Sequence, residues 1–116
     1  MSRKDKVKEE LKREISNIIQ EKIKDPRLGF LTVVDADLSV DLKYTKVYYS
    51  VLGTSEEQKI TQSILDGARG FIRKLIAERL KLRFVPEITF IMDNSVDNSL
   101  RIQQILDDIQ KKKENE

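Results

Sequence analysis

Apolar residues at helical spacing, interrupted by two closely spaced glycines, constrain this 116-residue chain more than any other feature. The helical spacing runs to Asp66 and breaks at the sequence Gly-Ala-Arg-Gly, positions 67–70. It restarts at Phe71, and Pro86 then precedes a strand-like alternation at 88–92. The pattern predicts a helix, a break, a second helix and a strand, in that order.

This order of elements is the centre of a KH-type nucleic-acid-binding module. Such a module uses the connection between its helices to bring backbone N–H groups close to a phosphate. Glycine permits that approach, so Gly70 is expected to allow close packing or an unusual dihedral. A simple corner between two helices, with glycine at a helix end, would also give the sequence at positions 67–70. These four residues alone therefore do not distinguish a KH-type connection from such a corner.

Upstream, the chain predicts one more helix and a hairpin. Apolar residues at spacings of three and four predict a helix from about Arg3 to Lys24, which Asp25-Pro26 ends. Alternation at 32–40 predicts a first strand with its even-numbered residues inward, and alternation at 46–51 predicts a second strand.

The remaining signals complete an α+β domain. Ser55 and Gln58 form a predicted capping box for the helix before the break, and apolar residues from Ile102 to Ile109 predict a last helix. We therefore expect a three-stranded mixed sheet with its first and third strands parallel, covered by helices on one face. Residues 1–110 are expected to form one domain, and residues 111–116 a disordered charged tail.

Composition excludes several classes of protein. Cysteine and histidine are absent, which removes thiolate metal sites and the commonest general base, so neither a cofactor nor a metal is expected. No apolar run approaches the length of a membrane span, and the N-terminus lacks the core of a signal peptide. A soluble cytoplasmic protein without a membrane partner is the expectation.

Charge is concentrated although the net charge is only +2. Between positions 69 and 83 the single acid Glu78 stands among six bases, a pattern that indicates local contact with a polyanion. Lys24 and Arg27, in the loop after the first helix, are further candidates. The predicted RNA-binding residues are Lys24, Arg27, Arg69, Arg73, Lys74, Arg79, Lys81 and Arg83.

Other interpretations stay open at this point. Asp35 and Asp37 are two apart on one predicted strand and could hold Mg²⁺ in a metal-dependent nuclease or phosphodiesterase, although cross-strand pairing with Lys46 explains them as well. Tyr44 and Tyr48 could stack on bases or simply pack across strands. A protein–protein adaptor that uses the first helix is a third possibility.

With these residues in view, the chain resembles the ribosome-binding factor A family from about Arg3 to Leu106. The resemblance rests on three segments, which are KDPRLG at 24–29, the hairpin residues Asp41-Leu42 and Lys46-Val47-Tyr48, and GFIR at 70–73 leading to LRFVPEITF at 82–90. One departure is visible, because members commonly carry glycine where this chain has Ser99.

The resemblance implies a fold and a function. The implied fold is a single type II KH-like domain, α-β-β-α-kink-α-β plus a C-terminal helix, in which an Ala-x-Gly kink replaces the usual loop. Ala68, Arg69 and Gly70 match that kink. The implied function is non-catalytic: a monomeric cytoplasmic factor that binds 16S rRNA on the free 30S subunit and assists late processing and assembly, including in cold adaptation.

Overall fold

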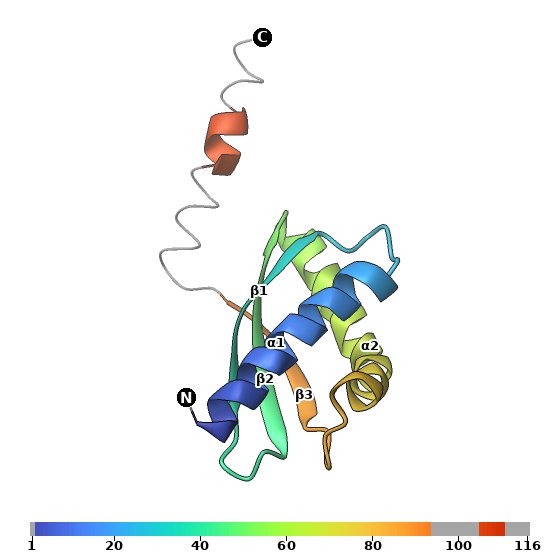
Figure 1. The fold of residues 1–116 in the computed structure, drawn as a ribbon. Coiled ribbons are helices and arrows are strands. Elements are labelled where there is room, and N and C mark those ends of the chain that lie inside the picture. Colours follow the sequence, from blue (N-terminus) through green and yellow to red (C-terminus); the bar gives the residue numbers. More distant parts are fainter. Residues whose placement is uncertain (1, 94–104, 111–116) are drawn as a thin grey trace.

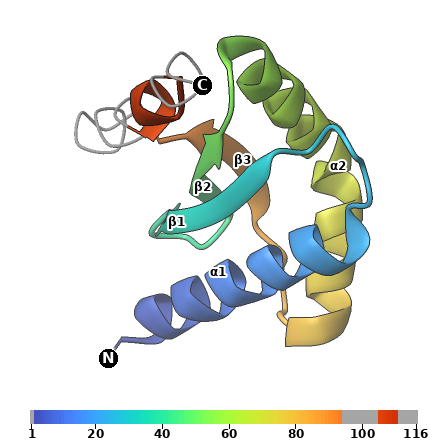
Figure 2. The same ribbon diagram turned by 90° about the horizontal axis from the view of Figure 1, so that it is seen from above.

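The computed structural model describes residues 2–93 and 105–110 and shows an α+β domain. Its elements are α1 (Arg3–Lys22), β1 (Phe30–Leu38), β2 (Tyr44–Leu52), α2 (Ser55–Leu80) and β3 (Glu87–Met92). Helices α1 and α2 lie against one face of the sheet, as Figures 1 and 2 show. The element order is that of a type II KH-like domain, so the predicted fold class is confirmed.

The strands form a mixed sheet in the order β1-β2-β3. Strand β1 is antiparallel to β2, and β2 is parallel to β3. The prediction of a mixed sheet is confirmed, but the prediction that the first and third strands are parallel is wrong. These two strands run in opposite directions because the hairpin reverses the chain once and the helical crossover brings β3 back parallel to β2.

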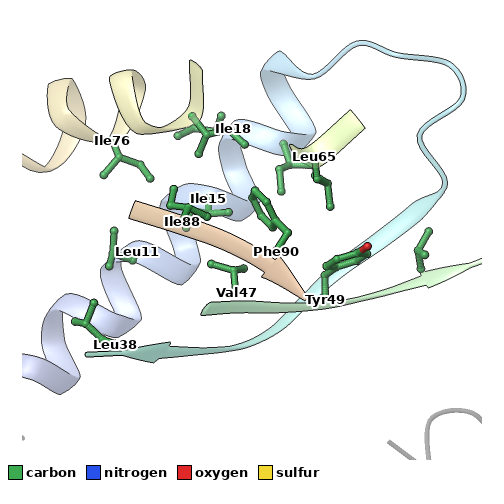
Figure 3. Close-up of a cluster of buried hydrophobic side chains, with 13 residues drawn as sticks. Leu11, Ile15, Ile18, Leu38, Val47, Tyr49, Leu65, Ile76, Ile88 and Phe90 are labelled. Atoms are coloured by element: carbon green, nitrogen blue, oxygen red, sulfur yellow. The ribbon is translucent and has the colours of Figure 1, made fainter. Parts of the chain in front are cut away.

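The hydrophobic core fills the space between the sheet and the two helices (Figure 3). Each element contributes side chains at the spacing that its periodicity predicts, every third or fourth residue from a helix and every second residue from a strand. Its largest members include Leu11, Ile15 and Ile18 from α1, Leu65, Ile72 and Ile76 from α2, and Leu38, Val47, Tyr49, Ile88 and Phe90 from the strands.

A small polar network is built into this core. The Tyr49 hydroxyl donates to the side-chain oxygen of Gln62, whose amide nitrogen donates to the Phe90 carbonyl at 2.9 Å and to Asp66 Oδ1 at 3.1 Å. Burial, with a smaller contribution from the charge of Asp66, raises the pKa of Tyr49 to about 12. Through these hydrogen bonds the phenol and Gln62 help to fix α2 against β3.

Strand β1 contains a bulge that sequence periodicity did not reveal. Val33 and Asp35 pair with adjacent residues of β2, which leaves Val34 as the extra residue. One extra residue reverses which side chains face inward. The prediction of inward even-numbered residues therefore holds at Ala36 and Leu38. It is wrong at Thr32, which is exposed, and at Val40, which lies beyond the end of β1 and is 92% exposed.

Helix α2 begins at a capping box one residue earlier than predicted. The Thr54 hydroxyl accepts from the Glu57 N–H at 3.2 Å, and the Glu57 carboxylate accepts from the Thr54 N–H at 3.3 Å. The predicted pair of Ser55 and Gln58 is therefore wrong by one position. Both pairs have the right spacing, and the structure shows that Thr54, not Ser55, has the extended backbone of a helix cap.

The predicted break at 67–70 is a continuous part of α2. The helix bends near its middle, where these residues lie, so its two halves point in different directions in Figures 1 and 2. Neither Gly67 nor Gly70 has a positive φ, and a Cβ atom added to either would meet nothing within 4 Å. The expectation that Gly70 permits close packing or an unusual dihedral is therefore wrong, because it is an exposed helical position.

This geometry predicts that Gly70→Ala stabilises the domain by about 0.5–1 kcal/mol, since alanine favours the helix and restricts the unfolded chain. Gly29→Ala is the matched contrast, because its added Cβ would lie 2.7 Å from the Val51 side chain. That variant should lose about 1–3 kcal/mol. Urea denaturation followed by circular dichroism measures both changes, and a destabilised Gly70→Ala protein would show that the bend requires glycine.

Beyond β3, the structure describes residues 105–110 as helical, within the predicted last helix. Ile105 and Ile109 there are each 50% exposed. The start of the predicted last helix, the position of Ser99 and the charged tail at 111–116 lie outside the described residues. Within the described part of the chain, no helix is long and apolar enough to cross a bilayer.

Candidate nucleic-acid interface

Hydrogen bonds give the loop between α1 and β1 a defined shape. The backbone N–H and Nε of Arg27 donate to Asp25 Oδ1 at 2.9 and 3.1 Å, and its terminal nitrogen donates to Oδ2 at 2.9 Å. Hydrogen bonds from the Arg27 side chain and backbone are the main reason that the pKa of Asp25 is lowered to about 2. This pair holds the exposed Arg27 side chain in place and partly neutralises its charge.

The same loop is fastened to α2 at its far end. The Gly29 N–H donates to the hydroxyl of Thr61, a buried residue of α2, at 3.3 Å. Glycine is needed here because of the close approach of Val51. The loop therefore lies beside the middle of α2.

A shallow groove, called here the loop–helix groove, separates this loop from α2. Its floor is apolar, and Phe71, the residue at which the helical spacing of apolar residues restarts, is 47% exposed in it. The lining residues are Lys22, Ile23, Lys24, Asp25, Pro26, Arg27, Ile60, Ser63, Ile64, Gly67, Ala68 and Phe71.

Several of the basic residues that the sequence predicts to bind RNA lie close to this groove. Lys24 and Arg27 line its loop side and are exposed. Lys74 is exposed and lies two helical turns after Gly67, which places both on one face of α2. Arg69 is exposed too, but it lies on another face of α2 than the lining residues Gly67, Ala68 and Phe71, and its Nε donates to the Asp66 carbonyl at 3.2 Å. Within the described residues, neither lysine has an ion-pair partner, so both charges are available to a ligand.

Arg73 does not belong to this exposed set. It is half-buried, and its Nε and a terminal nitrogen donate to the carbonyls of Pro86 and Val85 at 3.1 and 3.0 Å. Two of the nitrogens of Arg73, which the charge pattern predicted to bind RNA, are therefore already engaged within the protein. The guanidinium group of Arg73 thus links α2 through two hydrogen bonds to the segment that precedes β3.

Arg79 also has partners within the protein. Its two terminal nitrogens lie 3.3 Å from Glu14 Oε2 and 3.5 Å from Glu21 Oε2, both on α1. The two remaining predicted cations, Lys81 and Arg83, are exposed beyond the end of α2, away from the loop–helix groove. The eight predicted residues are therefore not one surface, and neighbours in sequence have different roles.

The two aspartates considered for a metal site both follow the bulge in β1, and each faces a lysine of the protein. Asp35 lies 3.2 Å from Lys8 Nζ, and its pKa is lowered by a hydrogen bond from the Ala36 backbone and by Lys8. Asp37 lies opposite Lys46 in the register of the hairpin, as cross-strand pairing predicted. Among the described residues, no three His, Cys, Asp or Glu side chains gather at a metal-binding distance.

Comparison with known proteins agrees with this architecture. A sequence model of the family described as ribosome-binding factor A matches residues 3–106. The chain belongs to the ribosome-binding factor A family. A family member from Thermodesulfovibrio yellowstonii is 49% identical over 104 residues, which cover 90% of this chain and 87% of that protein. A member from Halothermothrix orenii is 44% identical over 106 residues, covering 91% of this chain and 87% of that protein.

Solved structures of the family share the fold. The solution structure of a ribosome binding factor A from Thermotoga maritima is similar with a TM-score of 0.70 and 40% identity, covering 78% of this chain and 87% of that one. The crystal structure of ribosome-binding factor A from Thermus thermophilus gives a TM-score of 0.69 and 28% identity, covering 78% of this chain and 97% of that one. A homology model of Thermus thermophilus ribosome binding factor A, fitted into a cryo-EM map of its complex with the 30S subunit, gives a TM-score of 0.61 and 30% identity, covering 72% of this chain and 87% of that one.

Proposed function

We propose that this protein is a non-catalytic maturation factor of the small (30S) ribosomal subunit, which binds 16S rRNA and assists late processing and assembly. The observation that carries the proposal is family membership over residues 3–106, joined to the Thermus thermophilus relative that was fitted into a 30S complex. We further propose that it acts in the cytoplasm as a monomer and supports growth in the cold.

The loop–helix groove is the proposed centre of RNA contact. Lys24 and Arg27 would meet phosphates on one side of the groove, and Lys74 on α2 would meet them on the other, whereas Arg69 would contact RNA that passes over the outer face of α2. Gly67 and Gly70 leave the backbone of α2 uncovered between these cations, so a phosphate can approach closely along the proposed kink at Ala68, Arg69 and Gly70.

The proposed mechanism is positioning. A protein that binds one arrangement of immature rRNA more tightly than the alternatives raises the population of that arrangement. Electrostatic contacts suit this role because they are reversible and let the factor leave when the mature subunit presents a different surface.

Co-sedimentation tests the proposal directly. Wild-type protein should sediment with immature 30S subunits and much less with mature 70S ribosomes, and crosslinks should map to 16S rRNA. Labelled precursor rRNA incubated with the protein and Mg²⁺ should stay uncut, because the proposed factor does not cleave RNA. Equal sedimentation with both particles, or none with either, would contradict the proposal.

Salt dependence provides a quantitative check. If the interface neutralises about four to six phosphates, the logarithm of the association constant should fall against the logarithm of salt concentration with a slope of about −3 to −5. Fluorescence anisotropy with a labelled 16S rRNA fragment measures the slope between low and physiological salt. A slope near zero would rule out the cationic groove as the main source of affinity.

A further inference from the structure

A second depression, called here the end groove, lies at the opposite end of α1 from the loop–helix groove. It has a volume of about 480 Å³ and lies between the first turns of α1, the β1–β2 turn at 41–44 and the α2–β3 connection at 82–87. Figure 1 shows these segments at the lower end of the domain, where α1 begins.

Two aromatic side chains stand exposed among its lining residues. Phe84 is 73% exposed and Tyr44 is 57% exposed, whereas Val7, Leu82 and Val85 are half-buried and pack against the core. A single exposed apolar side chain is ordinary on a protein surface. Two exposed rings beside one apolar depression indicate a surface that contacts something flat and apolar.

The protein holds the connections around this groove in defined conformations. Leu42 and Lys81 both adopt positive φ, at 62° and 50°, a region that residues with side chains occupy at an energetic cost. The Leu42 N–H donates to the Ser39 carbonyl at 2.9 Å, and Arg73 holds the carbonyls of Val85 and Pro86. The groove is therefore preorganised before any ligand arrives.

Its charges favour an anion. The lining cations are Arg3, Lys43, Arg73 and Arg83, against the acids Asp41 and Glu87. The Asp41 carboxylate already accepts hydrogen bonds from the Ser39 hydroxyl and the Lys43 N–H. The guanidinium carbon of Arg83 lies 5.7 Å from the centre of the Phe84 ring, so a cation and an aromatic face occur together.

We propose that the end groove binds an unstacked nucleobase of single-stranded RNA, with the base against Phe84 and Tyr44 and its neighbouring phosphates near Arg3, Lys43 and Arg83. Aromatic faces accept any base by stacking, and the surrounding cations match the backbone. This inference rests on the proposed RNA-binding function and adds to it a second contact of different chemistry, about the length of α1 away from the loop–helix groove.

The test compares a single-stranded RNA oligonucleotide with an abasic oligonucleotide of the same length and charge. Anisotropy should show that the wild-type chain binds the base-bearing strand about tenfold more tightly. Phe84→Ala should remove most of that preference while it keeps the salt-dependent affinity for the abasic strand. Phe30→Ala is the matched control, because Phe30 is 75% exposed but lies outside the end groove, and it should behave like wild type.

The outcomes separate this inference from the function on which it rests. If wild-type protein binds neither strand, the RNA-binding function fails and the inference fails with it. If wild type binds both strands and Phe84→Ala matches Phe30→Ala, only the nucleobase site is overturned. If Phe84→Ala weakens association with 30S subunits without changing oligonucleotide affinity, the end groove contacts a ribosomal protein and the nucleobase assignment is wrong.

Discussion

A chain that carries Lys24→Glu and Lys74→Glu together should stay folded and lose most of its association with immature small subunits. Lys24 lines the loop side of the loop–helix groove, Lys74 lies on α2 about one turn beyond the lining residue Phe71, and both lysines are exposed. Each reversal removes an attraction of about 1 kcal/mol to a phosphate and adds a comparable repulsion. The sum of about 2–4 kcal/mol corresponds to an affinity about 30- to 1000-fold lower.

The double reversal needs a control of equal charge change. The control is the double variant Lys4→Glu and Lys6→Glu, because both lysines are exposed on the first turns of α1 and neither lines the loop–helix groove. Both double variants should melt close to wild type, since exposed substitutions cost within about 0.5 kcal/mol. If the folded Lys24/Lys74 variant co-sediments like the control, the rRNA surface lies elsewhere on the molecule.

Much of the fold follows from the sequence because each element repeats its apolar residues at its own period. The stripe of Leu11, Ile15 and Ile18 and the inward residues Val47 and Tyr49 are all buried as their spacing predicts. Periodicity carries no information about register. The bulge in β1 and the parallel pairing of β2 with β3 depend on contacts between distant segments, so the sequence pattern could not supply them.

The candidate site was less predictable because adjacent basic residues look alike in sequence. Arg73 and Lys74 follow each other, yet one is fixed to backbone carbonyls more than ten residues away and the other is exposed. Arg79 likewise forms ion pairs with glutamates of α1, which are distant from it in the sequence. Charge density identifies a basic segment of the chain, but only tertiary contacts show which of its charges already have partners within the protein.

Arg73→Ala should destabilise the domain by about 2–3 kcal/mol, although sequence patterning assigns this residue to a phosphate contact. Its guanidinium donates to the carbonyls of Val85 and Pro86, and removing it leaves both partly buried oxygens without that donor. For a domain of this size the loss corresponds to a melting temperature lower by about 10–20 °C. Arg73→Lys should recover only part of the stability, because a single ammonium group cannot reproduce the two-pronged geometry.

The neighbouring Lys74→Ala variant provides the comparison, since it changes the same charge one residue further along α2. Lys74→Ala should unfold at nearly the wild-type urea concentration and bind rRNA more weakly. Arg73→Ala should unfold earlier, and in conditions where it remains folded it should keep most of its rRNA affinity. If Arg73→Ala proves as stable as Lys74→Ala while losing more affinity, Arg73 contacts RNA directly and its hydrogen bonds to the α2–β3 connection contribute little to stability.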